Sequence, residues 1–404
     1  MLAKIFSFWA MHPGWVPGAA FLLFSLSPPA YPQAPQSDLT EMNIEDLMKI
    51  EVTSVSRHEQ PLSQTAAAAF VITEEDILHS GAENVPELLR MVPGVQVAQI
   101  NASSWAISVR GCSGRFSNKV LVMVDGRTVY VPSYGGVFYD VLDVPLEQIA
   151  RIEVIRGPGG SIWGSNAVNG VINILTKKAG ATPGTTVVGG GGSTGRGFGL
   201  VQEGDKLGSA GDFRIFTKYS TDGSLRAPDG QLEGDGWHLL HGGFRTDSQI
   251  SSKDSLSVQG DLYSGREGTS LPFTFSLTQP PSINTLAEVN LSGGSIQTSW
   301  NHQYSARSDT TLMVSYQRYA RTDALDERRG TLDVDFQHNF SIGGRHQFVW
   351  GFDYRHSSSQ SGGGIRFLTG SSQSGNQSLQ RICAGSDCVG HRPPLSHGWR
   401  QAGT

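Results

Sequence analysis

The sequence predicts an α+β domain followed by an antiparallel β-sheet of the kind that closes into a transmembrane β-barrel. Three observations lead to this prediction. Residues 38–178 mix helix-start signals with short apolar strands. Strict alternation of apolar and polar residues replaces this mixture after Thr182. The connections between the alternating segments are long and short in turn, as in barrels of the outer membrane.

Local capping and turn signals define the first region. Thr73 precedes three acidic residues and predicts a helix N-cap, with Gly81 as the stop. A second predicted helix starts at Asn84 and ends at Pro93. Asp125-Gly126 separates two apolar runs and predicts a two-residue hairpin turn. Further short strands complete a unit of about 140 residues, the usual size of one domain.

The second region consists of segments with one apolar and one polar face. Leu332, Val334 and Phe336 share one face, with Asp333 and Asp335 on the other. We count about nine such segments, most of them near the roughly 9–11 residues that a tilted strand needs to cross a bilayer. A soluble β-sandwich also alternates, so the loop lengths and the aromatic residues near strand ends decide for a barrel. We expect these aromatic residues to form the girdles at the two membrane interfaces. They are Trp237, Tyr263, Tyr304, Tyr316, Tyr319 and Tyr354.

The N-terminus and the composition limit the location and the partners. Lys4 precedes an apolar stretch over 14–26 and predicts a secretory signal peptide over 1–34. No later stretch approaches the ~18 apolar residues of a membrane helix. The net charge of −5 gives no basis for a nucleic-acid partner. The three cysteines do not form a disulfide framework.

A glycine-rich stretch, RIEVIRGPGGSIWGSNAVNGVINILTKK, occupies residues 151–178. It lacks the Gly-Lys-Ser/Thr of a phosphate-binding P-loop, and a strand rather than a helix follows Gly170. The glycines therefore indicate tight bends where strands pack closely against other backbone.

Four motifs stand in the order found in the plug domain of TonB-dependent outer-membrane receptors: ELLRMVPGVQV (87–97), ISVRG (107–111), VLVMVDGRTVY (120–130) and the stretch 151–178. The chain resembles this family over about residues 39–178. The resemblance implies a plug inside a 22-stranded barrel, in the outer membrane of a Gram-negative bacterium, with no cofactor and no enzymatic activity. It also implies a division of the chain into a signal peptide (1–34), a periplasmic TonB-box segment (38–60), a plug (61–180), N-terminal barrel strands (184–356) and an atypical tail (357–404).

The resemblance implies functional residues as well. The TonB box, an extended segment that adds to a partner's sheet edge, best matches Ile50, Glu51, Val52, Thr53, Ser54 and Val55; an ordinary first plug strand is the alternative. Plug–barrel contact is expected from Arg110, Gly111, Arg156 and Gly157, the alternative for the arginines being solvated charges at strand ends. Structural plug positions are Gly94, Asp125, Gly126, Pro158, Gly164, Asn169 and Gly170.

The sequence also departs from the family pattern. Cys112 stands where an aromatic residue usually follows Arg-Gly. About nine strands cannot close a 22-stranded barrel, and unpaired strand edges are prohibitive in lipid. The tail from about Arg381 suggests a frameshift. Its Cys383-x4-Cys388 pair, with two nearby histidines, does not have a standard zinc spacing.

The expected function is energised uptake of a scarce ligand, driven through the TonB complex. An iron–siderophore complex is the first expectation, with haem, cobalamin or an oligosaccharide as alternatives. A second hypothesis is a truncated receptor that no longer transports and leaves a periplasmic plug-like binding module. No catalytic triad, carboxylate pair or zinc signature indicates an enzyme.

Overall fold

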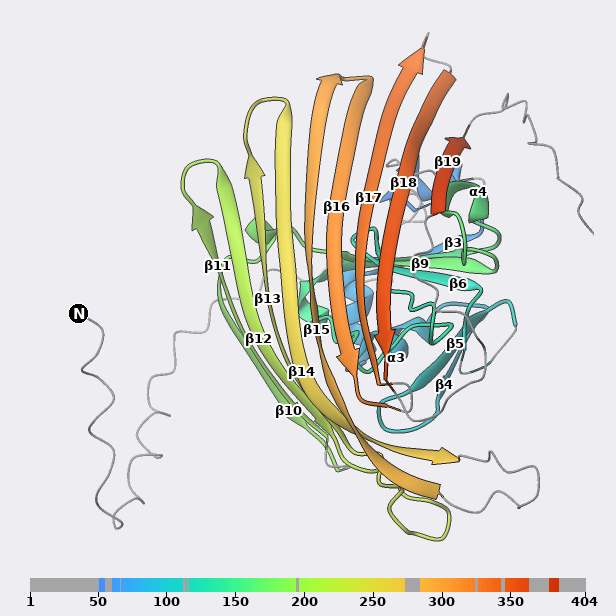
Figure 1. Ribbon diagram of the computed structural model, residues 1–404. Coiled ribbons are helices and arrows are strands. Elements are labelled where there is room, and N and C mark those ends of the chain that lie inside the picture. The colour runs from blue at the N-terminus through green and yellow to red at the C-terminus, as the bar shows by residue number, and fades with distance from the viewer. Residues whose placement is uncertain are drawn as a thin grey trace, which may run out of the picture. The chain divides into compact units, whose positions relative to one another are not determined.

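A computed structural model of the chain describes residues 51–54, 60–65, 67–111, 114, 116–193, 196–272, 284–323, 326–342, 346–362 and 378–384. These residues form a small α+β domain, here called the plug, and a ten-stranded antiparallel sheet (Figure 1). The expected signal peptide, Cys112 and Cys388 lie outside the described residues. No helix in the described part of the chain is long and apolar enough to cross a membrane.

The core of the plug is a five-stranded sheet in the order β3-β8-β9-β6-β7. Strands β6 and β9 are parallel, and the other neighbours are antiparallel. Every residue of β6 is buried, as expected for a central strand whose sequence is entirely apolar. The bounds are β3 Ala69–Thr73, β6 Val120–Val124, β7 Arg127–Thr128, β8 Ile149–Arg156 and β9 Gly170–Thr176.

Two capped helices pack on this sheet, where the sequence predicts them. Helix α2 (Glu74–Ser80) begins with a capping box, in which the Thr73 hydroxyl accepts from the Asp76 amide and the Asp76 carboxylate accepts from the Thr73 amide. Asn84 caps α3 (Val85–Leu89). Both predicted helix starts are confirmed, but α3 ends at Leu89 and not at Pro93, because a turn follows it. Further elements of the plug are the hairpin of β4 (Val95–Gln99) with β5 (Trp105–Val109), the short helix α4 (Gly160–Trp163), and the 3-10 turns η2 (Leu62–Gln64), η3 (Leu146–Gln148) and η4 (Ala179–Ala181).

The predicted glycine bends are present. Asp125 and Gly126 both have positive φ, +47° and +81°, which gives the two-residue hairpin turn between β6 and β7. At Gly170, an added Cβ would lie 2.6 Å from the carbonyl oxygen of Ile155 and 3.1 Å from Val109 Cγ1. No side chain fits there, so this glycine permits the close strand packing that the sequence predicts.

The second region is a single sheet in which each strand pairs with its neighbours along the chain. It has ten described strands, one more than the count of about nine, because the last short strand also pairs with its predecessor. The strands are β10 Gly184–Gly191, β11 Gly197–Leu207, β12 Gly211–Asp222, β13 Trp237–Gln249, β14 Asp254–Pro272, β15 Asn284–Ser305, β16 Ser308–Arg321, β17 Glu327–Ile342, β18 His346–Ser361 and β19 Ser378–Ala384.

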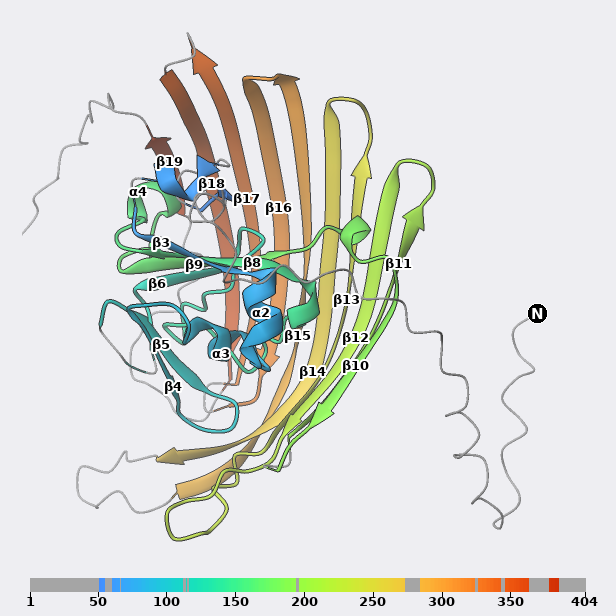
Figure 2. The ribbon, with the colours of Figure 1, turned by 180° about the vertical axis from the view of Figure 1, so that it is seen from behind.

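The two faces of this sheet have opposite character. Figure 2 shows the plug elements on its concave side, and the side chains that face them are polar and buried, such as Arg214, Lys218 and Gln297. The other face exposes apolar side chains, including Leu262 at 75% and Ile296 at 49%. A soluble sandwich would bury its apolar face, whereas a membrane barrel turns it toward lipid. The burial pattern therefore favours the barrel.

The expected aromatic residues divide between the two faces. Tyr304 and Tyr316 are exposed on the apolar face, as in an interfacial girdle. Tyr263 and Tyr319 instead face the plug, where both line a cavity together with Phe138. The girdle prediction is therefore wrong for these two residues, because strand-end position alone does not indicate which face a side chain occupies.

Candidate functional site

A short N-terminal strand, β1 (Glu51–Val52), is docked on the plug. It pairs antiparallel with β2 (Gln60–Pro61), which brings Glu51 opposite Pro61. Val52 is fully buried in an apolar cluster with Leu121, Met123 and Val171. Residues 51–54 of the segment that best matches a TonB box therefore pack against the plug core, whereas Ile50 and Val55 lie outside the described residues.

A buried carboxylate holds the residues that follow β1. Glu153, only 1% exposed, accepts hydrogen bonds from the backbone amides of Thr53 (3.0 Å) and Ser54 (2.7 Å). The Thr53 hydroxyl (3.2 Å) and Arg151 Nε (2.8 Å) donate to the same group. These donors satisfy a charge whose burial would otherwise be costly.

Two further side chains complete this docking site. Trp163 Nε1 donates to the carbonyl oxygen of Ser54 at 2.6 Å. Asn173 Nδ2 donates to the hydroxyl of Ser54 at 3.1 Å. Glu153 and Asn173 face each other directly across β8 and β9. Sequence reasoning missed both residues. The available signal was a polar residue inside each of two otherwise apolar runs, IEVI and VINIL.

The expected plug–barrel residues contact one another within the plug. Arg110 has φ +55°, and its Nη1 lies 3.5 Å from the position that a Cβ of Gly157 would occupy. Arg156 Nη1 donates to the carbonyl oxygen of Pro93 at 2.9 Å. Gly111 (φ +86°) and Gly94 (φ +83°) provide the adjoining bends. No ion pair joins Arg110 or Arg156 to a barrel acid among the described residues, so that role stays a prediction.

The remaining structural positions lie around α4. Pro158 precedes this helix and Gly164, with φ +73°, caps its C-terminus. The Asn169 amide donates to the carbonyl oxygen of Lys119 at 2.8 Å, just before Gly170 begins β9.

Two buried ion pairs join a plug loop to the sheet. Asp143 pairs with Lys218 of β12 at 2.5 Å, and Asp140 pairs with Arg321 of β16 at 2.5 Å. Arg321 also pairs with Glu267 of β14, and all five side chains are less than a tenth exposed. Asp140 and Asp143 lie on the plug and their cationic partners on the sheet, which is the reverse of the polarity expected for Arg110 and Arg156. Next to these acids, burial and the neighbouring Tyr134 raise the pKa of the Tyr139 phenol, so it stays neutral.

The Asp-Gly turn makes a second set of contacts with the sheet. Gln259 of β14 donates to the Asp125 carboxylate at 3.0 Å, and Gln297 of β15 donates to its carbonyl oxygen at 2.8 Å. Arg127 donates to Gln317 of β16 at 2.8 Å. The turn predicted as a structural feature of the plug therefore also contacts three adjacent strands.

A row of aromatic rings lies near the sheet end that carries the long connections. Phe116 contacts Tyr134 (centroids 5.3 Å apart), Tyr134 contacts Phe138 (4.4 Å), and Phe138 contacts Tyr319 near the end of β16 (5.9 Å). The Arg321 guanidinium carbon lies 4.0 Å from the Phe138 ring centroid. Phe116, at the outer end of the row, is 60% exposed. This arrangement offers ring faces and edges to a ligand.

Comparisons with known proteins agree with this architecture. Residues 61–171 match the TonB-dependent receptor plug domain family. The vitamin B12 transporter BtuB of Vibrio cholerae is 36% identical over 203 residues, which are 49% of this chain and 32% of that protein. BtuB of Vibrio vulnificus is 37% identical over 144 residues, or 35% of this chain and 23% of that protein. The match thus spans a third or less of the length of these relatives.

Solved structures show the same fold at low identity. The pyoverdine outer-membrane receptor FpvA of Pseudomonas aeruginosa PAO1 has a TM-score of 0.61 at 15% identity, over 78% of this chain and 50% of that one. The ferric yersiniabactin uptake receptor FyuA of Yersinia pestis has a TM-score of 0.57 at 17% identity, over 72% and 49%.

The plug lies on the polar face of an open ten-stranded sheet whose other face is apolar, an arrangement that matches part of a plugged outer-membrane β-barrel. The chain is similar to the TonB-dependent receptors over the plug domain and part of the barrel of that family. Its location is the outer membrane of a Gram-negative bacterium.

Proposed function

We propose that the chain serves energised uptake of a scarce ligand, with TonB pulling on the segment from Ile50 to Val55. The observation that supports this proposal is the docked strand. Its contacts beyond Val52 are hydrogen bonds to the side chains of Glu153, Trp163 and Asn173. An extended segment binds a partner's sheet edge through its main-chain groups. The amides of Thr53 and Ser54 and the carbonyl oxygen of Ser54 are occupied in the docked state, so docking and capture by a partner exclude each other.

For the ligand, we propose an iron–siderophore complex, with cobalamin as the alternative. The structural neighbours are receptors for pyoverdine and ferric yersiniabactin, whereas the relatives with higher sequence identity are vitamin B12 transporters. The aromatic row from Phe116 to Tyr319 supports a ligand with flat, unsaturated groups. Competition between labelled ferric siderophores and cyanocobalamin for cells that carry the chain distinguishes the two.

The test of energy coupling is the variant Val52→Pro, which removes a main-chain donor and fixes φ. In cells that lack other receptors for the ligand, this variant is expected to bind ligand at the surface but to lose uptake. Val52→Ala, which keeps the amide, is the matched control and should retain most of the uptake. Unchanged uptake in Val52→Pro would remove the proposed role from this segment.

Membrane fractionation tests the second hypothesis of a periplasmic, non-transporting product. A transporter is recovered in the outer membrane and migrates differently on gels before and after boiling. Recovery in the soluble periplasmic fraction, without such a shift, would instead support the plug-like binding module.

A further inference from the structure

A groove crosses β14, β15 and β16 on the sheet face that points away from the plug. Its volume is about 430 Å³, which lies within the range of roughly 300–1,000 Å³ typical of ligand pockets. Apolar side chains form its walls and small residues form its floor. The walls are Leu262, Ile296 and Tyr316, and the floor is Ser292, Gly294 and Ala320.

The pairing of the strands keeps the groove open. Gly294 lies at its centre, opposite Leu262 on β14 and Arg318 on β16. A Cβ at Gly294 would lie 2.5 Å from Leu262 Cδ2 and 2.3 Å from the carbonyl oxygen of Asp261, so no side chain fits there. Leu262 is 75% exposed beside this gap. The groove therefore offers an apolar surface that no side chain of the described residues covers.

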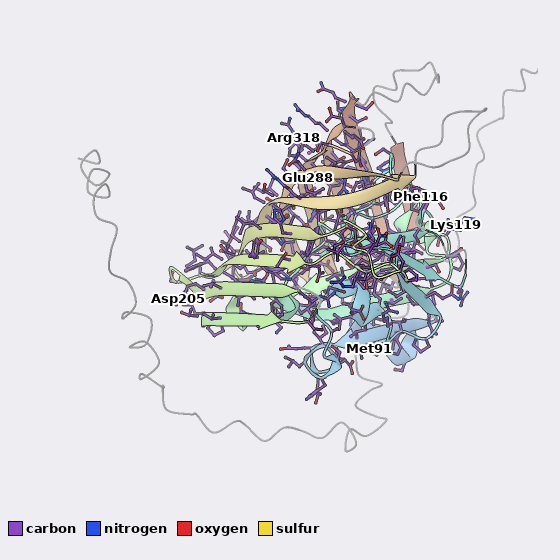
Figure 3. All side chains as sticks on the ribbon, turned by 90° about the horizontal axis from the view of Figure 1, so that it is seen from below. Met91, Phe116, Lys119, Asp205, Glu288 and Arg318 are labelled. Atoms are coloured by element: carbon purple, nitrogen blue, oxygen red, sulfur yellow. The ribbon has the colours of Figure 1, made fainter. Side chains whose placement is uncertain are left out.

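Two arginines lie at the end of the groove that is nearer the long connections. Arg318 pairs in register with Gly330, and Arg328 lies two residues before Gly330 on the same face of β17. Such diagonal neighbours are about 7–8 Å apart. Both arginines are exposed and neither makes an ion pair within the described residues. The nearby Arg266 differs, because it pairs with Glu288 at 2.8 Å. Figure 3 shows Arg318 and Glu288 on the side of the sheet away from the plug.

The position along the strands places these charges at a membrane interface. Arg318 lies three residues before the end of β16, at the sheet end with the long connections. Tyr304 lies ten residues further along β15 than Gly294 and belongs to the exposed aromatic residues of the opposite end. Ten residues of strand span about 33 Å, and at the usual tilt they cover the ~25 Å height of the apolar band of a barrel. Arg318 therefore lies at the level where lipid phosphates begin.

We propose that this groove binds a phosphorylated, acylated lipid of the outer leaflet. Arg318 and Arg328 bind the phosphate, because guanidinium groups form charge-assisted, bidentate hydrogen bonds with phosphate oxygens. One acyl chain lies along Leu262, Ile296 and Tyr316. The site is independent of the proposed uptake function, since it involves only the lipid-facing side of the sheet.

The experiment measures binding of bisphosphorylated lipid A to the purified full chain in detergent, by native mass spectrometry. The double variant Arg318→Gln/Arg328→Gln should weaken binding at least tenfold. Arg266→Gln, which removes a cation that already has an acidic partner, is the matched control and should change the affinity less than twofold. Ser292→Trp fills the groove without changing charge and should also weaken binding at least tenfold. Heat-modifiable gel migration checks that each variant is folded.

Removing the phosphates from lipid A should weaken its binding to the unaltered chain at least as much as the double variant weakens the binding of bisphosphorylated lipid A. Equal binding of the two lipids, or an unchanged affinity in the double variant, would overturn the proposal. A full affinity in Ser292→Trp would show that phosphate binds outside the groove and would overturn it equally. Absence of saturable binding to the unaltered chain would do the same.

Discussion

The plug and the sheet bury opposite kinds of side chain. In the plug, Leu88 and Ile172 are fully buried, whereas most buried residues of the sheet are polar, such as Lys218 and Gln297, with a few apolar exceptions such as Leu239. The sheet instead exposes its apolar residues, with Leu262 at 75%. Both regions obey one rule, since apolar groups move to the least polar surroundings available. For the plug these are its own interior, and for the sheet they are the lipid.

This difference makes the surface between plug and sheet polar. Its contacts are ion pairs such as Asp143–Lys218 and amide contacts such as Gln297 to Asp125. Polar contacts of this kind can be replaced by water when two parts separate, unlike a continuous apolar core. The plug is thus docked on the sheet through contacts that water can replace if the two separate.

The largest effect is expected where a buried charge loses its partner between the two regions. Arg321→Met leaves Asp140 and Glu267 as uncompensated buried acids. Removing one partner of a buried pair costs about 3–5 kcal/mol. In lipid vesicles, the plug of this variant should become sensitive to protease at a clearly lower urea concentration. Arg266→Met, in a pair that is more than half exposed, should cost at most about 1 kcal/mol. Equal effects of the two variants would mean that the buried ion pairs of Arg321 do not hold the plug on the sheet.

The same substitution should act differently in the two regions. Leu88→Ala in the plug removes a fully buried side chain and is expected to cost about 2–5 kcal/mol. Leu262→Ala should cost about zero, because lipid tails are as apolar as the leucine they replace. Urea unfolding of the plug measures the effect of Leu88→Ala. The temperature at which the sheet loses its folded mobility on gels measures the effect of Leu262→Ala. A large loss in Leu262→Ala would mean that this side chain packs against protein rather than lipid.

Local signals in the sequence predict the plug well and its contacts poorly. The Thr73 cap and the Asp125-Gly126 turn depend on neighbours within four residues, so the chain encodes them where they occur. The contact between Asp140 and Arg321 joins residues 181 apart in sequence, and neither position has a local pattern that names the other. Alternation likewise reveals two faces of the sheet but not which face meets the plug. For this reason the sequence predicts that Tyr263 and Tyr319 lie in the girdle, although they face the plug.

A smaller effect is expected at the docked N-terminal strand. Glu153→Gln keeps the shape but replaces one acceptor oxygen with a donor that faces the amides of Thr53 and Ser54. An unsatisfied buried group costs about 1–3 kcal/mol. Hydrogen exchange at these two amides should therefore rise roughly 5- to 140-fold. Glu74→Gln, on a side chain that is 54% exposed, is the control and should leave the exchange unchanged. Unaltered exchange in Glu153→Gln would mean that the carboxylate does not hold the strand.

The smallest effect tests whether the two regions are stabilised independently. Thr73→Ala removes the hydroxyl that caps α2 and is expected to cost about 1 kcal/mol of plug stability. Thr73→Ser keeps the cap and should restore most of that loss. The cap touches no residue of the ten-stranded sheet within the described contacts. The temperature at which that sheet loses its folded mobility on gels should therefore not change. A shift of that temperature in Thr73→Ala but not in Thr73→Ser would mean that plug and sheet unfold as one cooperative unit, and the polar surface between them would then be a tighter junction than its contacts imply.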